Sequence, residues 1–244
     1  MIQLKFALLI ILIGLLEITS FLAPTQAKLS QTSPKASDPQ KPPRSGSPDG
    51  REPGGTRGPC EDVGSPFTPL LPVTDSEFSG FTLTEYPTFW FYIPYQTSSV
   101  SSGKFTLEDR EENLVYRLRF KLPETPGFVR VSLPTTEKAL EKNKDYRWTL
   151  MLYCTSPGSS ERDRVWHQGW VERLEMPELE SLVQTAPLTQ QLELYIENNI
   201  WYDASINLPQ IRNSPTDWER LLRAIGLEEL EQEAIAGDVE GMEN

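Results

Sequence analysis

Apolar and polar side chains alternate in short runs between residues 59 and 177, and proline or glycine interrupts these runs about every ten residues. The clearest run is 114–121, where Leu114, Tyr116, Leu118 and Phe120 alternate with mostly basic side chains. A period of two indicates strands with one face toward a core and one toward water. We therefore predict a mainly β domain over 59–177, an antiparallel β-sandwich that is immunoglobulin-like in pattern only.

Residues 86–95 (YPTFWFYIPY) depart from this alternation, because aromatic side chains occupy both faces of the run. Pro87 and Pro94 bound it, as strand ends permit. The pattern predicts a strand that is central, or covered on its outer side by another element. A further predicted strand, 146–154, places Trp148 and Cys154 on the same inward face.

From residue 178 the apolar period changes to that of a helix. Trp201, Ala204, Leu208 and Ile211 share one helix face, and the stretch from Ser214 to Asp217 is typical of a helix start, with serine as the N-cap, proline in the first turn and aspartate reaching back. Gly226 with Leu227 resembles a glycine C-cap. Two or three antiparallel helices are expected over 178–227. The acidic tail, 228–244, is expected to be frayed helix that passes into disorder.

The first 58 residues show two further patterns. Residues 1–27 have a basic start, an apolar run and a small residue at the end, which is typical of a signal peptide; an uncleaved anchor is the alternative. Residues 28–58 form a Pro/Ser/Gly-rich basic linker, predicted to be disordered. Two roles are open for this linker: a solvated spacer, or a basic arm that touches an anionic surface of the cell envelope. The chain is thus expected to be exported, periplasmic or extracellular, with no transmembrane span once the leader is cleaved.

Composition excludes several classes of site. The formal net charge of −12 argues against nucleic acid as a partner, because binding to phosphates depends on lysine and arginine. One histidine and two cysteines cannot build a Cys/His zinc site, a haem pair or an iron–sulfur cluster, so no metal and no cofactor is expected. Two cysteines in an exported chain most often form one disulfide. Cys60 is therefore predicted to pair with Cys154.

An ordered set of motifs resembles a known family. They are RGPC (57–60), YPTFWFYIPY (86–95), PGF (126–128), YRW (146–148), GWVER (169–173), IWYDA (200–204) and WERLL (218–222). Together they are similar to an uncharacterised exported family of cyanobacteria that is classed as a domain of unknown function, over about residues 57–227. The resemblance implies export and the limits of the domain. It implies no activity, substrate or catalytic residue.

No catalytic residue is predicted. His167, the single histidine, falls in a predicted strand and is interpreted as a strand residue at a surface or edge. Residues 101–104 match Ser-x-x-Lys, but we place them in a serine-rich loop, and no Lys-Thr-Gly element accompanies them. With 35 acidic residues, some carboxylate pair will always have the spacing of a glycoside hydrolase, so that spacing carries no information.

Aromatic side chains give the candidate binding residues. Trp166, Gln168 and Trp170 share one strand face and form a candidate ligand platform, whereas Trp201, Tyr202 and Trp218 mark candidate partner-binding helices. The first hypothesis is a non-enzymatic interaction module of the cell envelope that contacts a protein through the helices. The alternative is a carbohydrate-binding module that uses two exposed tryptophans to hold a polysaccharide. An uncharacterised hydrolase is the second alternative.

Overall fold

The computed structural model describes residues 54–55, 60, 63–73, 79–155 and 163–242. The predicted leader (1–27), nearly all of the predicted linker (28–58) and the last two residues of the tail lie outside the described residues. The strands are β1 (Gly54–Gly55), β2 (Thr68–Pro69), β3 (Ser79–Thr82), β4 (Thr88–Ile93), β5 (Val100–Asp109), β6 (Leu114–Lys121), β7 (Gly127–Ser132), β8 (Lys144–Cys154), β9 (Arg164–Arg173), β10 (Ile235–Asp238) and β11 (Glu240–Gly241). The helices are α1 (Pro177–Thr185), α2 (Leu188–Glu197), α3 (Trp201–Ala204), α4 (Leu208–Arg212) and α5 (Pro215–Ile225), followed by a 3-10 turn (Glu228–Leu230).

The strands form two sheets, as the sandwich prediction requires. The larger sheet has the order β1-β9-β8-β5-β6-β11, with β3 also pairing with β9, and the smaller has the order β10-β7-β4-β2. The central pairings are antiparallel. Two edge pairings, β3 with β9 and β10 with β7, are parallel. β3 and β10 are short strands that each pair at the edge of a sheet and are not joined to their partner strand by a hairpin turn.

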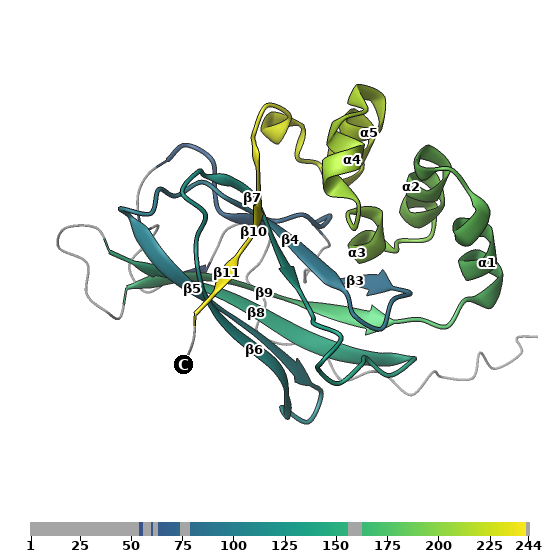
Figure 1. The fold of residues 1–244 in the computed structure, drawn as a ribbon, viewed down its shortest axis with the longest axis horizontal. Helices are drawn as coiled ribbons and strands as arrows, with labels where there is room; N and C mark the ends of the chain where they lie inside the picture. Colours follow the sequence, from purple (N-terminus) through teal and green to yellow (C-terminus); the bar gives the residue numbers. More distant parts are fainter. Residues whose placement is uncertain (1–53, 56–59, 61–62, 74–78, 156–162, 243–244) are drawn as a thin grey trace, which may run out of the picture. The chain divides into compact units, whose positions relative to one another are not determined.

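Aromatic side chains fill the space between the sheets. Phe89 of β4 packs on Phe105 of β5 with ring centroids 4.9 Å apart, and Phe91 meets Trp148 of β8 edge-on at 5.3 Å. All six residues of β4 are buried, because its other face lies beneath the helices. The prediction that this aromatic strand is covered on both sides is confirmed. Figure 1 shows the helices on the side of the smaller sheet.

Five helices follow the sandwich where two or three were predicted. The apolar face from Trp201 to Ile211 is present and buried, but the helix is interrupted at residues 205–207 and becomes α3 and α4. Tyr202 connects α3 to the sandwich, since its hydroxyl accepts the Trp148 Nε1–H at 2.6 Å and donates to the Trp170 carbonyl at 2.8 Å. Among the described residues, no helix has the length and apolarity needed to cross a membrane.

The predicted ends of α5 are half correct. Gly226 has left-handed backbone angles and the Leu227 N–H donates to the Leu222 carbonyl at 2.9 Å, so the glycine C-cap is confirmed. At the start, Ser214 makes no capping hydrogen bond through its side chain. Asp217 does not reach back to the cap either, because its carboxylate accepts the Thr189 hydroxyl at 2.8 Å and so joins α5 to α2.

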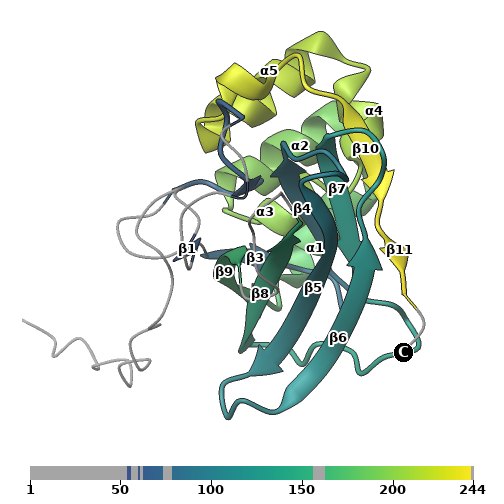
Figure 2. The ribbon, with the colours of Figure 1, turned by 90° about the vertical axis from the view of Figure 1, so that its left-hand side faces the viewer.

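The tail is more ordered than predicted, because residues 228–242 form a 3-10 turn and two strands instead of a frayed helix. β10 pairs with β7 of the smaller sheet and β11 with β6 of the larger, so one segment spans both sheets at the edge shown in Figure 2. Asp238 forms an ion pair with Arg130. Gly127, at φ 148°, lets the chain pass close to the Ala234 carbonyl, where a Cβ would lie 2.2 Å from that oxygen.

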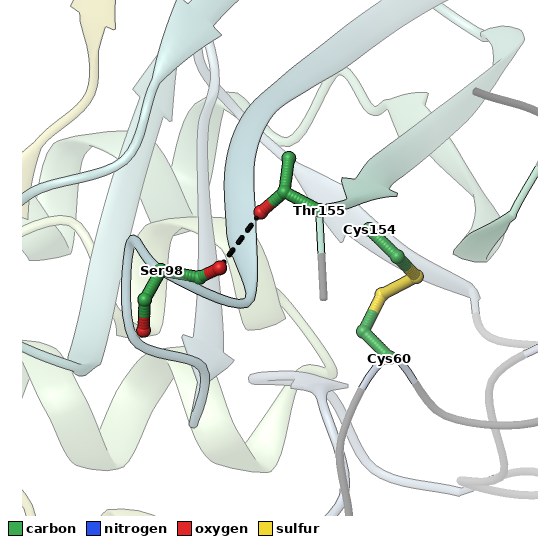
Figure 3. Close-up of a disulfide and its surroundings, with 4 residues drawn as sticks. All are labelled: Cys60, Ser98, Cys154 and Thr155. Carbon is green, nitrogen blue, oxygen red and sulfur yellow. Dashed lines mark hydrogen bonds between the residues drawn. A yellow bond between two sulfur atoms is a disulfide. The ribbon is translucent and has the colours of Figure 1, made fainter. Parts of the chain in front are cut away.

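The predicted disulfide is present. Cys60 and Cys154 are bonded, with their Cα atoms 5.1 Å apart and a sequence separation of 94 (Figure 3). Cys154 ends β8, and the following Thr155 hydroxyl donates to the Ser98 carbonyl at 2.9 Å. The bond therefore attaches the entry segment of the domain to a long central strand.

Candidate functional site

The side of the larger sheet that faces away from the smaller sheet is the candidate site. Strand register places its side chains in three rows that cross four strands. We call these twelve positions the outer face: Arg164, Tyr153, Ser102 and Lys121 in the first row, Trp166, Met151, Lys104 and Arg119 in the second, and Gln168, Thr149, Thr106 and Arg117 in the third. No helix that the structure describes packs over this face in Figure 1.

The outer face is strongly basic although the chain is acidic. Five of its twelve positions are lysine or arginine and none is acidic, against a net charge of −12 for the whole chain. Arg117, Arg119 and Lys121 are exposed along β6. Alternate residues of a strand lie about 7 Å apart, so these three cations form a line along the sheet.

Two of these cations lie directly opposite each other. Lys104 on β5 is the cross-strand partner of Arg119 on β6. Like charges at directly opposite positions destabilise a sheet. No ion pair joins Lys104, Arg117, Arg119 or Lys121 to another described residue, even though Glu240 is the cross-strand neighbour of Lys121. Among the described residues, the acidic cross-strand neighbour Glu240 lies beside Lys121, whereas the facing pair Lys104 and Arg119 has no ion-pair partner.

In the next row along the sheet, acidic partners neutralise the arginine side chains, and one arginine covers Trp170. Arg147 forms an ion pair with Glu108 at 2.8 Å. The Arg110 guanidinium lies over the Trp170 ring, 5.5 Å from its centroid, and also pairs with the buried Asp145. This row therefore marks the end of the open basic surface.

The predicted platform is only partly open. Trp166, Gln168 and Trp170 do share one face of β9, as predicted, and the first two are half-buried. Trp170 is only 8% exposed, so the expectation of two exposed tryptophans was wrong. The cause is Arg110, which folds from the β5–β6 hairpin over the ring. Gln168 and Trp170 also have other interactions, so the half-buried aromatic side chains left on the outer face are Trp166 and Tyr153.

The predicted partner-binding helices turn their aromatic side chains inward. Trp201, Tyr202 and Trp218 are all buried, and Trp218 is 1% exposed. Trp218 packs edge-on against Phe128 of β7 with centroids 5.3 Å apart. These side chains fill the space between helices and sandwich, so the prediction that they form an exposed patch was wrong.

The residues considered for catalysis lie in two strands of the larger sheet. His167 lies on the inner side of β9 and is fully buried, with Nε2 2.6 Å from the Phe67 carbonyl oxygen, so its predicted position at a surface or edge was wrong. Residues 101–104 belong to β5 and not to a loop. Among the described residues, no group of three or more His, Cys, Asp or Glu side chains has the arrangement of a metal site.

A cleft of about 270 Å³ lies at the turn end of β5 and β8, lined by both acidic and basic side chains. The Asn113 side chain, by hydrogen bonding, holds the pKa of Asp109 below its usual value. Hydrogen bonds from Lys144 and Lys138 lower the pKa of Glu141 in the same way. A general acid needs a raised pKa. The pKa values of Asp109 and Glu141 are shifted in the opposite direction.

A family model described as Domain of Unknown Function (DUF928) matches residues 52–235. The chain belongs to the DUF928 family. This match covers the strands that carry the outer face and the five helices, so sandwich and helices belong to one DUF928 domain. No curated protein and no solved structure shows significant similarity to the chain.

Sequence reasoning missed the basic part of the outer face. The alternation of Arg117, Arg119 and Lys121 is visible in the sequence, but it is also the ordinary pattern of a wet strand face. Lys104 and Arg164 join them only through the register of β5, β8 and β9. Cross-strand register is set by long-range pairing, so no local signal identified the site.

Proposed function

We propose that this DUF928 domain is an exported, non-enzymatic interaction module that binds an anionic polymer of the cell envelope on its outer face. The observation that carries the proposal is the unpaired basic surface around Lys104 and Arg119. Such repulsion lowers the stability of the fold. Unfavourable local arrangements that a protein nevertheless keeps are typical of functional sites. A polyanion supplies the missing negative charge.

Two features support export. The Cys60–Cys154 disulfide is typical of proteins that fold in oxidising compartments. The sequence pattern of residues 1–27 is that of a signal peptide. Both fit a protein whose partner is an envelope component.

A binding role also fits the chemistry of the domain better than catalysis does. His167 is enclosed in the sandwich core, and the pKa values of Asp109 and Glu141 in the cleft are lowered. A binding face needs only fixed charges, and the hydrogen-bonded strands of the larger sheet hold them in place.

Removing two cations from the outer face tests the proposal. We expect R117Q/R119Q to weaken binding to alginate, used as a soluble polyanion, by about tenfold at low salt, and to reduce the dependence of affinity on salt. Isothermal titration calorimetry measures both quantities. Because a like-charge repulsion is removed, the urea midpoint of the variant should equal or exceed that of the wild type.

The matched control is K138Q/K142Q, which removes two charges away from the outer face. Both lysines are exposed, in surface ion pairs with Glu141 and Glu175. This control should bind alginate like the wild type. Equal affinity of R117Q/R119Q and wild type, or equal losses in both double variants, would overturn the proposal.

A further inference from the structure

One aromatic side chain lies in register with the central cations. Trp166 on β9, Met151 on β8, Lys104 on β5 and Arg119 on β6 are consecutive cross-strand partners and so form a single row. Three strand spacings of about 4.8 Å separate the first residue from the last, which gives about 14 Å between their Cα atoms. The row thus has an aromatic ring at one end and two cations at the other.

The surroundings of Trp166 keep its ring accessible from the row. Trp166 is half-buried, and its cross-strand partner on the far side is Gly54, a residue without a side chain. In the neighbouring row Thr149 is half-buried and places a hydroxyl group beside the aromatic and basic positions, whereas its cross-strand partner Thr106 is buried.

These groups match a particular class of polyanion. An indole ring stacks on the C–H face of a sugar, hydroxyl side chains exchange hydrogen bonds with sugar hydroxyls, and lysine and arginine pair with carboxylates. A membrane surface would instead favour a cluster of protruding apolar side chains, whereas the exposed large apolar residues beside Arg117 and Arg119 are two separate ones, Leu114 and Met242. Single-stranded nucleic acid carries a charge on every nucleotide and is bound mainly through lysine and arginine, which the acidic balance of the whole chain does not favour.

We infer that the anionic polymer is an acidic polysaccharide. One of its sugar rings stacks on Trp166, and carboxylate groups of the polysaccharide pair with Lys104 and Arg119. This assignment rests on the proposed function, and it adds the ligand class and the residue that recognises it. The bound polysaccharide lies across the strands of the larger sheet, because the row that carries both kinds of contact crosses those strands.

The test compares Trp166→Ala and Trp166→Phe with the wild type in alginate titrations at one fixed salt concentration. Loss of the stacking surface should weaken binding about tenfold in the alanine variant, and the phenylalanine variant should recover much of the affinity. Circular dichroism and the urea midpoint identify any variant whose fold has changed. Because the outer face holds an accessible ring, titration of alginate should also quench tryptophan fluorescence, and this quenching should be lost in both Trp166 variants.

The outcomes separate the two proposals. If Trp166→Ala binds alginate like the wild type while R117Q/R119Q does not, the polysaccharide assignment is wrong and the anionic-polymer function stands. If neither variant changes binding, both are wrong. Oligo(dT) and phosphatidylglycerol vesicles serve as the other polyanions. Binding to either that is as tight as binding to alginate at the same salt would overturn the assignment to a polysaccharide.

Discussion

Loss of the Cys60–Cys154 disulfide is expected to lower the free energy of unfolding by about 4–5 kcal/mol, because the bond closes a long loop and restricts the unfolded chain. The urea midpoint of C60A/C154A, compared with that of the oxidised wild type, measures the effect. For a domain of ordinary stability this is a large fraction of the total. We expect the variant to be partly unfolded at growth temperatures.

A reductant separates this effect from the loss of side-chain packing. Dithiothreitol should lower the midpoint of the wild type to near that of C60A/C154A and leave the variant unchanged. Alanine is chosen at both positions because Cys154 is buried and a serine hydroxyl there would need a partner. A wild-type midpoint that does not respond to reductant would show that the bond contributes nothing to stability.

The second large effect concerns Asp203, a buried carboxyl group between α3 and β3. Its Oδ2 accepts the Leu83 N–H at 3.1 Å, and burial raises its pKa to about 6. An unfolded aspartate has a pKa near 3.9, so the native state holds this proton more tightly. The contribution of Asp203 to stability is therefore greatest below about pH 4 and falls as pH rises to about 6.

Asp203→Asn should therefore stabilise the protein at neutral and basic pH. The gain should reach up to about 3 kcal/mol at pH 8, since one pKa unit corresponds to about 1.4 kcal/mol, and should shrink to near zero by about pH 4. The measurement is the difference in the free energy of unfolding between variant and wild type at several pH values. The amide keeps an oxygen that can accept the Leu83 N–H.

Glu178→Gln is the matched control for this prediction. It removes the same charge from an exposed position on α1, so it should produce no gain that depends on pH. If the difference between Asp203→Asn and wild type has the same value at pH 4 and pH 8, the carboxyl group does not titrate as the buried geometry requires.

The sandwich could be predicted because its signals are local. The alternation in β6 and the aromatic residues on both faces of β4 each follow from a few neighbouring residues. The disulfide followed from the cysteine count together with the inward face of Cys154. Gly226 marked the end of α5 because few other residues adopt its backbone angles readily.

The features that were missed depend on distant partners. The sequence of β10 predicts a strand only weakly. The strand forms because it pairs with the edge of β7 and because its Asp238 forms an ion pair with Arg130. The burial of Trp170 depends on Arg110, which comes from a different hairpin. The basic outer face likewise exists only once Lys104 and Arg119 are paired by register.

Lysine footprinting tests the central claim most directly, because the chain carries lysines both on and off the outer face. Acetylation of the protein with and without bound alginate, read by mass spectrometry, reports the accessibility of each amine. We predict that alginate protects Lys104 and Lys121 and leaves Lys138 and Lys142 as reactive as before. Unchanged labelling of Lys104 and Lys121 in the bound state, or protection confined to Lys138 and Lys142, would contradict the assignment of the outer face as the binding surface.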